Sequence, residues 1–441
     1  MRVHIAGFLK RPAVVAAISI LILRGLTLSS RFLLSVLLAR MLSPDEMGQY
    51  GLITAVLAFA LLALGLEFYS HTLREMVPAT PEKRTQIIAD QITLSAITFL
   101  IIGVAASLAI FTGLFPSRLA PWFLLILATE HLSLEATRIL IITSRPVRAY
   151  FVVFLRGGIW VYAIATLMFV VPSERTLEAV LIWWALGGAL SIAFAAFSLS
   201  DLPWRNLKRY HPDWAMMLAG LRTARPFILT AAGALIISYV DRFIIDKFIG
   251  REALGIYTFY STISIGLLSL GASASHQFLP KVIAGYASGR DAYRANLQSF
   301  FWSLFVITCG MTIVAGLTMW PMLALFGLSQ YAASIWVFYS MLPGVLLRIL
   351  ADVPSYALYA ARADGSLLLC NVGSAIISLL LNIVLIPILG IYGAAIASGV
   401  ASGVLLLALT FLTVRKMREV HASPGATSLA GLPTDAEMLY P

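Results

Sequence analysis

The chain has little charge, and this scarcity excludes an ordinary soluble fold. Charged residues make up 12% of the 441 residues and hydrophobic residues 60%, with a mean hydropathy of +0.90. Soluble domains carry about 25% charged residues. The composition is therefore typical of a protein embedded in a membrane.

Cysteines and catalytic motifs are also scarce. Cys309 and Cys370 stand apart within apolar segments, which argues against a disulfide framework and a cysteine metal site. The sequence holds no Walker lysine motif, no Gly-X-Ser-X-Gly and no His-Glu-X-X-His. We predict no enzyme, no cofactor and no metal.

Long apolar runs are what the chain has instead. A membrane-spanning helix takes about 20 residues, and the candidate spans use most of the chain. We place these twelve spans at 13–38, 48–70, 88–113, 119–142, 149–171, 177–199, 224–247, 253–277, 299–325, 333–360, 366–388 and 391–414. The predicted fold class is an all-α polytopic membrane protein with no room for a soluble catalytic domain.

The longest connection between spans divides the chain nearly in half. It is basic, aromatic and amphipathic, and we expect it to lie on the inner membrane surface against anionic lipid. The basic segment Met1–Pro12 is predicted to precede a retained first helix rather than to act as a signal peptide. The predicted organisation is two six-helix lobes at 1–199 and 224–418, a cytoplasmic linker at 200–223 and a disordered tail at 419–441.

The net charge of +10 is explained by membrane topology and does not require a nucleic-acid partner. With the N-terminus inside, most Lys and Arg outside the spans fall in cytoplasmic segments, as the positive-inside rule requires. An even number of spans then places both termini in the cytoplasm. The external segments hold only Arg40, Arg118, Arg175, Lys247 and Arg251.

The two halves resemble each other in sequence. When residue 40 is aligned with residue 247, Asp45 meets Glu252, Gly48 meets Gly255 and Tyr50 meets Tyr257. A looser alignment places the turn 145–149 over 362–366. Halves of six helices share one orientation, so their pseudo-two-fold axis would run along the membrane normal, with a cavity between them. The spans 13–38 and 224–247 would be its corresponding walls.

The first span contains two arginines at membrane depth. Arg24 and Arg31 are two helical turns apart on one face, near Thr27 and Ser35. A charge at this depth costs at least about 2.5–3.5 kcal/mol, so each needs water, a partner or an anionic ligand. Either they tie helices together or snorkel to an interface, or they line a cavity for an anion. The further arginines within spans favour the cavity.

Two more arginines extend this hypothesis. Arg156 precedes Gly157 and Gly158, which permit close backbone approach. Arg348 stands four residues before Asp352, a spacing that suits an internal ion pair. We favour a structural pair there, and a pair that opens with substrate or a proton is the alternative. The predicted cationic substrate-binding cavity comprises Arg24, Arg31, Arg156 and Arg348.

Acidic residues within the spans are the candidates for coupling or gating. Glu130 either carries a proton or neutralises an arginine of a neighbouring helix, and Glu135 and Arg138 have the spacing of a pair. Asp241 and Arg242 point about 100° apart, so they cannot simply pair. They are either solvated near the external interface or face the cavity. The predicted coupling or gating residues are Glu130, Asp241, Arg242 and Asp352.

Three stretches carry a resemblance to a known family. They read Leu-Ala-Arg-Met-Leu-Ser-Pro-Asp-Glu-Met-Gly-Gln-Tyr (38–50), Tyr-Val-Asp-Arg-Phe-Ile-Ile through Leu-Gly-Ile-Tyr (239–257), and Leu-Asn-Ile-Val-Leu-Ile-Pro-Ile-Leu-Gly-Ile-Tyr-Gly-Ala-Ala (381–395). The chain resembles the polysaccharide-biosynthesis (O-antigen, Wzx-type) flippases of the multidrug/oligosaccharidyl-lipid/polysaccharide (MOP, MATE-like) superfamily.

The resemblance implies two six-helix lobes in a V shape, alternating access and a cationic central cavity. It implies a substrate of undecaprenyl-pyrophosphate-linked oligosaccharide (an O-antigen, capsule or exopolysaccharide repeat unit), moved between leaflets of the bacterial cytoplasmic membrane. Implied partners are membrane lipid and the polysaccharide polymerase and chain-length machinery, with no nucleic acid. Twelve spans suit this branch better than the lipid II flippases, which typically have fourteen.

Two other functions stay open. An ion-coupled multidrug exporter of the same superfamily predicts an acidic, aromatic cavity. Here the bases at membrane depth are all arginines, whose planar fork suits phosphate and carboxylate. A membrane-embedded polysaccharide polymerase or ligase predicts a large external loop, whereas the longest predicted loop is internal.

Overall fold

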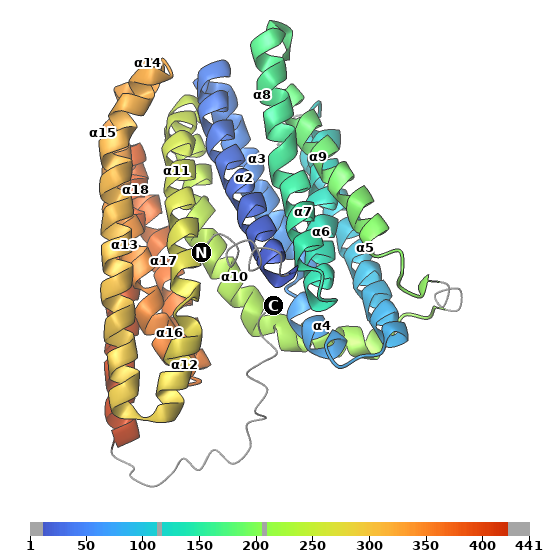
Figure 1. Cartoon of the computed structure of the whole chain (residues 1–441). Helices are drawn as coiled ribbons and strands as arrows, with labels where there is room; N and C mark the ends of the chain where they lie inside the picture. The colour runs from blue at the N-terminus through green and yellow to red at the C-terminus, as the bar shows by residue number, and fades with distance from the viewer. Residues whose placement is uncertain (1–11, 113–116, 205–209, 422–441) are drawn as a thin grey trace, which may run out of the picture. The chain divides into compact units, whose positions relative to one another are not determined.

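The computed structural model describes residues 12–112, 117–204 and 210–421, and every regular element in these ranges is a helix (Figure 1). Residues 1–11 of the predicted basic segment lie outside the described residues. The predicted tail also lies outside them, except that 419–421 end the last helix.

The described residues of the first half form eight α-helices and two short helices of other kinds. They are α2 (Pro12–Met41), α3 (Pro44–Gly65), α4 (Tyr69–Met76), α5 (Pro81–Phe111), α6 (Ala120–Ile142), α7 (Pro146–Phe154), the π-helix η1 (Leu155–Ile159), α8 (Trp160–Val170), the 3-10 helix η2 (Pro172–Glu174) and α9 (Leu177–Ser198).

The second half is helical throughout its described residues. Its helices are α10 (Trp214–Phe248), α11 (Arg251–His276), α12 (Leu279–Ser288), α13 (Arg290–Leu325), α14 (Ser329–Ala332), α15 (Ile335–Leu350), α16 (Asp352–Ala360), α17 (Asp364–Leu389) and α18 (Ile391–His421).

Eleven helical segments of the described chain are long and apolar enough to cross a membrane. The one predicted span that is missing from these eleven is 119–142. It corresponds to α6, which has 23 residues. Its sequence includes Glu130, His131, Glu135 and Arg138, which lower its hydropathy. The predicted class is confirmed: the chain is an all-α, multi-pass membrane protein.

The described chain divides into two compact units. The first takes in α2 up to Leu37 together with Val56–Ile228, and the second takes in Leu38–Ala55 and the residues from Leu229 onward. The divisions therefore fall inside α2, α3 and α10. Residues 38–55, which the sequence grouped with the first lobe, belong to the second unit.

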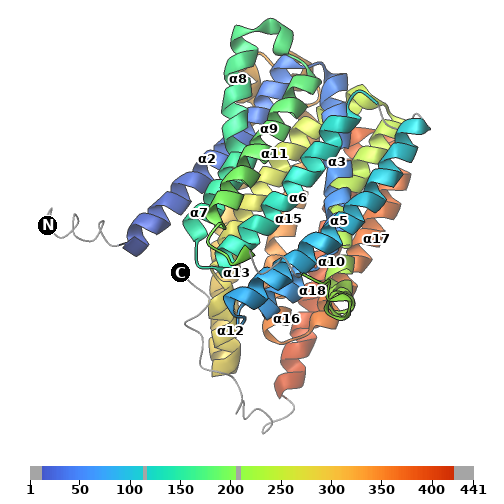
Figure 2. The same cartoon turned by 90° about the vertical axis from the view of Figure 1, so that its right-hand side faces the viewer.

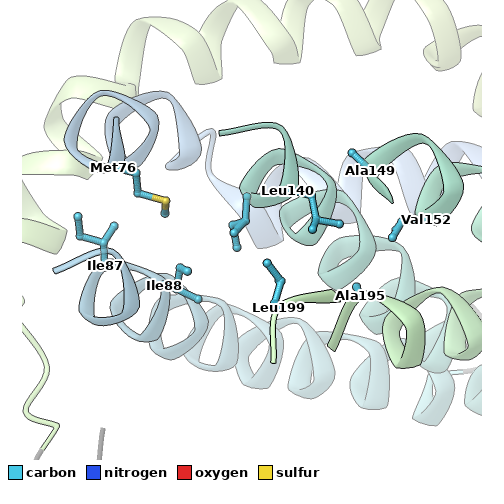
Figure 3. Packing of buried hydrophobic residues seen from close by; sticks show 9 residues of the cluster. Met76, Ile87, Ile88, Leu140, Ala149, Val152, Ala195 and Leu199 are labelled. Atoms are coloured by element: carbon cyan, nitrogen blue, oxygen red, sulfur yellow. The ribbon is translucent and has the colours of Figure 1, made fainter. Parts of the chain in front are cut away.

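In the first unit, α6, α7 and α9 pack against one another (Figure 1). Figure 3 shows the apolar cluster at one end of this packing, where Leu140 lies close to Leu199 and small residues, Ala149 and Ala195, let the helices approach. Pro146 begins α7, because the missing N–H of proline is not needed in a first helical turn. This cluster fixes the ends of α6, α7 and α9 relative to each other.

In the second unit, α12, α13, α15 and α16 supply the buried residues of another apolar cluster. Aromatic side chains pack elsewhere in this unit: the rings of Phe259 and Tyr331 lie 4.7 Å apart, and Tyr260 donates a hydrogen bond of 2.6 Å to the Tyr331 carbonyl. Figure 2 shows α12 and α16 at the same end of this unit. The hydrogen bond of Tyr260 thus joins α11 to the Tyr331 backbone, whereas the buried Tyr331 hydroxyl has no partner among the described residues.

The order of elements repeats between the halves. In each half two long helices are followed by a short one, α4 or α12, and then by another long helix. The turns before α7 and α17 repeat a rare feature: Ser144 and Arg362 both have left-handed backbones, with φ of 59° and 54°. The repeat seen in the sequence therefore extends to the backbone, with this turn aligned one residue away from the predicted pairing.

The helix α10 begins ten residues earlier than predicted. It starts at Trp214, whereas the predicted span began at residue 224, and it continues through Pro226. Asp213 caps it, since its Oδ1 accepts a hydrogen bond of 2.9 Å from the Met216 amide. The second part of the predicted linker is therefore membrane-helix structure, while residues 205–209 lie outside the described chain.

A buried carboxylate on α5 anchors the chain just before α10. Asp90 Oδ1 accepts hydrogen bonds from the Tyr210 hydroxyl at 2.6 Å and from the Asp213 amide at 3.0 Å. Burial and the hydrogen bond to Asp90 raise the pKa of Tyr210 to about 12, so the hydroxyl stays a donor.

Candidate functional site

One charge pair lies buried in the middle of the first unit. Arg156, on η1, places its Nη1 3.5 Å from Oε2 of Glu130 on α6. The two side chains are only 11% and 13% exposed. The sequence left open whether Glu130 carries a proton or neutralises a neighbouring arginine, and the structure shows the second arrangement.

Two tryptophans enclose this pair. Trp184 on α9 donates from Nε1 to Oε1 of Glu130 at 2.8 Å, and its ring stacks on Trp160 at 6.0 Å with an angle of 7°. Trp160 donates in turn to the Arg156 carbonyl at 2.8 Å. We call Arg156, Glu130, Trp160 and Trp184 the Arg156 cluster.

The π-helical turn of η1 explains how an arginine is accommodated here. A π-turn widens the helix and changes the pairing of its carbonyl groups, and such turns are frequent at functional sites. The Trp160 side chain binds the carbonyl of Arg156, and Ser30 on α2 donates to the carbonyl of Gly157 at 3.0 Å. Side chains from two elements therefore hold this wide turn in place.

The Arg156 guanidinium retains unused donor capacity. Its Nη1 is buried and has no hydrogen-bond partner among the described residues, although Glu130 lies at ion-pair distance. A buried donor without a partner costs free energy, and more so when it is charged. The arrangement is chemically suited to accept a further anionic or polar oxygen.

Arg24 and Arg31 lie elsewhere on the first unit. Both are exposed, and the Arg24 guanidinium carbon lies 5.7 Å from the centre of the Tyr150 ring. Thr27 and Ser35 are buried and donate to backbone carbonyls of α2 itself. The four residues predicted on one polar face therefore differ in burial: the Thr27 and Ser35 hydroxyls are buried, whereas Arg24 and Arg31 are exposed.

A second charged group is buried in the second unit. Asp241 and Arg242 on α10 are only 4% and 3% exposed, so of the two alternatives that the sequence left open, solvation near the external interface does not hold. Tyr257 on α11 donates to Asp241 Oδ2, and no ion pair joins the two neighbouring side chains in the described structure. Their different directions on the helix give each its own partners, as expected from the 100° offset.

Arg242 is held by the first half of α3. Its Nη1 donates to the Gly51 carbonyl at 3.1 Å and to Thr54 Oγ1 at 2.6 Å, and its Nη2 lies 3.5 Å from Ser261 Oγ. The Tyr239 ring centre is 4.8 Å from the guanidinium carbon. We call Asp241, Arg242, Tyr257 and Thr54 the Arg242 cluster.

Beside this cluster, α3 and α11 cross at two glycines that the sequence repeat aligned. A Cβ at Gly48 would collide with the Arg251 carbonyl, and a Cβ at Gly255 would collide with the Pro44 carbonyl. The two contacts are equivalent. In the alignment of the two halves, Pro44 pairs with Arg251 and Gly48 pairs with Gly255. Equivalent segments of the two halves therefore meet, backbone against backbone, at equivalent residues.

A family model described as "Polysaccharide biosynthesis protein" matches residues 14–280, more than half of the chain. The chain belongs to this polysaccharide biosynthesis family. The match includes the first two stretches that carried the resemblance and ends before the third, 381–395. It confirms the predicted family.

Solved structures show that this family member has the fold of the MOP superfamily. An inward-facing multidrug resistance MATE family transporter of that superfamily has a TM-score of 0.74 at 14% identity, covering 90% of this chain and 96% of the transporter. The lipid II flippase MurJ, in an inward closed conformation, has a TM-score of 0.70 at 14% identity, covering 93% and 90%. A search of curated protein sequences found no match.

Both clusters lie within the family-matched residues, whereas the predicted pair Arg348–Asp352 lies beyond them. Arg348 Nη1 is 3.9 Å from Asp352 Oδ1, with exposures of 33% and 21%. The two residues stand on consecutive helices, because α15 ends at Leu350 and α16 begins at Asp352. The predicted pair forms, but loosely and at a helix break.

The structure of this family member unites some predicted site residues and separates others. It joins Arg156 with Glu130, and it joins Glu135 with Arg138, where Gln91 also donates to Glu135. Arg24 and Arg31 are both exposed on α2, apart from these pairs. The sequence reasoning missed Trp160, Trp184, Thr54 and Tyr257, although the aligned Gly-X-Tyr segments did contain Tyr257.

Proposed function

We propose that this protein is a flippase that moves an undecaprenyl-pyrophosphate-linked oligosaccharide across the bacterial cytoplasmic membrane by alternating access. The substrate would be an O-antigen, capsule or exopolysaccharide repeat unit. Membership of the polysaccharide biosynthesis family and a fold shared with the lipid II flippase support this proposal. The single observation that carries it is the Arg156 cluster: a buried arginine with an unused donor.

The chemistry of the substrate explains why an arginine is needed. A pyrophosphate with attached sugars cannot leave water for about 30 Å of hydrocarbon unless donors replace its hydration. Arginine donates in a planar fork that matches two phosphate oxygens. The lipid tail can remain in the bilayer throughout, so only the headgroup requires a polar path.

Glu130 takes the place of the substrate when the protein is empty. An uncompensated guanidinium at this depth is unfavourable, and the carboxylate at 3.5 Å neutralises it. A pyrophosphate that reaches Arg156 competes with Glu130, while Trp184 continues to satisfy one carboxylate oxygen. The exchange of partners makes binding reversible, which transport requires, and Glu130 is the proposed coupling group.

Arg24 and Arg31 are proposed to guide the headgroup rather than to hold it. Both are exposed on the same unit as the Arg156 cluster. Two water-accessible arginines attract an anion without a large desolvation penalty. Arg348, loosely paired with Asp352, is proposed to serve similarly from the second half of the chain.

The glycine crossing is proposed to close the external side. The positive-inside distribution places the turns near residues 43–46 and 247–251 outside. Backbones that touch at Gly48 and Gly255 leave no passage for a sugar headgroup between these helices. Alternating access then requires the crossing to widen while the Arg242 cluster keeps α3 and α10 together. The same rule places both termini and the 200–223 linker at the cytoplasmic side, and polymerase and chain-length machinery are the proposed partners.

One observation favours a second function, export of a drug coupled to an ion. Asp241 is a fully enclosed carboxylate bound by Tyr257, which is a suitable group for taking up a proton. The MATE transporter shares the fold over most of both chains. This alternative predicts that Asp241→Asn abolishes pH-driven export of a cationic dye.

The deciding experiment is a leaflet assay in proteoliposomes with a fluorescent undecaprenyl-pyrophosphate oligosaccharide. We expect protein-dependent movement between leaflets that is lost in Arg24→Ala/Arg31→Ala and in Arg156→Ala. Arg222→Ala, which removes an exposed charge outside these clusters, is the matched control and retains transport. Normal transport by the double variant would remove Arg24 and Arg31 from the substrate path. Dye export without lipid movement would establish the drug exporter.

A further inference from the structure

A hollow at one end of the first unit lies apart from the residues used above. Its volume is 750 Å³, and it is formed where α2, the start of α7 and the end of α9 come together. The apolar cluster of Figure 3 includes Ala149 and Ala195, one turn or less from its lining residues. The hollow therefore has a rigid floor made by packed helices.

Two arginines stand at this hollow with only one carboxylate. Arg145 donates to both oxygens of Asp201, at 2.7 Å for Oδ1, and also to the Ser198 carbonyl. Arg148 makes one long contact of 3.4 Å to that same carbonyl. Arg145 is thus held in place and neutralised, whereas Arg148 supplies an excess positive charge whose donors are largely unused.

The pairing keeps these charges fixed over the physiological range. The hydrogen bond from Arg145 lowers the pKa of Asp201 to about 2, and the same bond raises the pKa of Arg145. Asp201 is therefore an anion and both arginines are cations at any pH near neutrality. The lining has a net positive charge, which selects an anion.

The remaining wall combines apolar side chains with Ser144, Ser198 and Ser200. Ala16, Val147 and Phe197 are among the apolar ones, and the Phe197 side chain is 74% exposed. A small hydrophilic anion gains nothing from these apolar side chains, whereas a ligand with a charged head and a hydrocarbon chain gains contact along them. The positive-inside distribution assigns the turn at Arg145 to the cytoplasmic leaflet, where anionic lipids gather.

We propose that this hollow binds the phosphate group of a single anionic lipid, with Arg148 and the free edge of Arg145 on the phosphate and the lipid chain along Phe197 and Ala16. The shared chemistry is a phosphate carried on a lipid. Its source is either a phospholipid of the inner leaflet or an undecaprenyl phosphate. The proposal does not depend on what the protein transports, because it concerns binding alone.

The test is native mass spectrometry of the full chain in detergent, with phosphatidylglycerol, phosphatidylcholine, undecaprenyl phosphate or inorganic phosphate added. We expect one tightly retained anionic lipid per protein and weaker retention of phosphatidylcholine. Arg148→Ala should weaken retention about tenfold, while Arg222→Ala, an equal loss of exposed charge outside the hollow, should leave it unchanged. Whichever anionic lipid binds more tightly identifies the source.

A second variant separates a lipid site from a simple phosphate site. Phe197→Ala removes only apolar contact and should weaken lipid retention severalfold while thermal stability is preserved. Equal retention of lipid by wild type and Arg148→Ala would overturn the proposal. So would binding of inorganic phosphate as tight as that of the lipids and indifferent to Phe197, and so would equal retention of phosphatidylcholine and phosphatidylglycerol.

Discussion

The Arg156 cluster and the Arg242 cluster solve the same problem in opposite ways. Each buries an arginine and a carboxylate among apolar helices. Arg242 is bound by a backbone carbonyl and hydroxyl groups, and its neighbour Asp241 is bound separately by Tyr257. Arg156 faces one carboxylate at 3.5 Å, and its Nη1 has no hydrogen-bond partner in the described chain.

The difference indicates which arginine is free to change partners. Arg242 donates through both Nη atoms to neutral groups of the protein, and only its buried Nε lacks a partner among the described residues, so Arg242 is suited to hold helices together. A guanidinium paired with a single anion can exchange that anion for another. We therefore assign a structural role to the Arg242 cluster and a ligand-binding role to the Arg156 cluster.

The largest expected effect on stability is at Arg242. Arg242→Ala removes the contacts to Gly51 and Thr54 and should lower the free energy of unfolding by roughly 3–5 kcal/mol, as when a buried charged network is broken. Thermal unfolding in detergent measures this change. Thr54→Val is the milder companion variant, because it removes one of the acceptors of Arg242 together with the hydrogen bond from Thr54 to the Gly51 carbonyl. Unchanged stability of Arg242→Ala would refute the structural assignment.

The second largest effect on stability is expected at Arg156, which has fewer hydrogen bonds to lose than Arg242. Arg156→Ala should destabilise the protein by about 1.5–3 kcal/mol, the usual range for a hydrogen-bonded charged group. The cause is an unpaired Glu130, so Arg156→Ala/Glu130→Gln should recover most of that loss, with Trp184 still donating to the side chain. Failure of Glu130→Gln to recover stability would show that Arg156 has structural partners beyond Glu130.

A smaller and purely conformational effect is expected at the glycine crossing. Gly255→Ala forces α3 and α11 apart, because the new methyl group would collide with the Pro44 carbonyl. Spin labels at the exposed residues Asp45 and Glu252 should report a longer distance, after replacement of the two cysteines. Gly266→Ala is the control on the same helix, since nothing lies within 4 Å of its added Cβ. An unchanged distance in Gly255→Ala would contradict the crossing as described.

The smallest effect is the pH dependence of the exposed Arg145–Asp201 pair. Asp201 has a pKa of about 2 when folded and about 3.9 when unfolded, so its stabilising contribution is present above pH 3.9 and is lost as the pH falls toward 2. Exposed pairs contribute little, so the change in thermal stability should be slight. The contribution of Asp201 is the difference in thermal stability between wild type and Asp201→Asn. A difference that changes between pH 5 and pH 8 would contradict its assignment to the titration of Asp201.

Much of the fold could be predicted from the sequence because hydrophobicity in a membrane is a strong signal. Runs of about 20 apolar residues have one regular solution, a helix, since each backbone group must be bonded internally. The signal predicted the span 119–142 close to the bounds of α6 in spite of Glu130 and Glu135, but it missed the boundaries of α10, which starts at Trp214 and continues through Arg222 and Pro226. Packing against neighbouring helices determined those boundaries, and packing is not visible in composition.

The candidate site was only partly predictable for a related reason. The rarity of charge at membrane depth singled out Arg156, Glu130, Asp241 and Arg242 as candidates, but it left open whether Glu130 pairs with an arginine and whether Asp241 and Arg242 are solvated. It gave no information on which neutral groups would bind them. Trp184 and Thr54 are ordinary residues in apolar helices, and only the three-dimensional arrangement makes them partners.

The measurement that tests the central claim most directly is the rate of lipid-linked oligosaccharide flipping per folded molecule. It should be compared between Arg156→Ala/Glu130→Gln and Arg242→Ala in the same proteoliposome assay. We predict that the first variant is stable and flips at least 100-fold more slowly than wild type. We predict that the surviving folded fraction of the second flips within a few fold of wild type. Normal flipping by the first variant would contradict the assignment of Arg156 as the anion-binding residue.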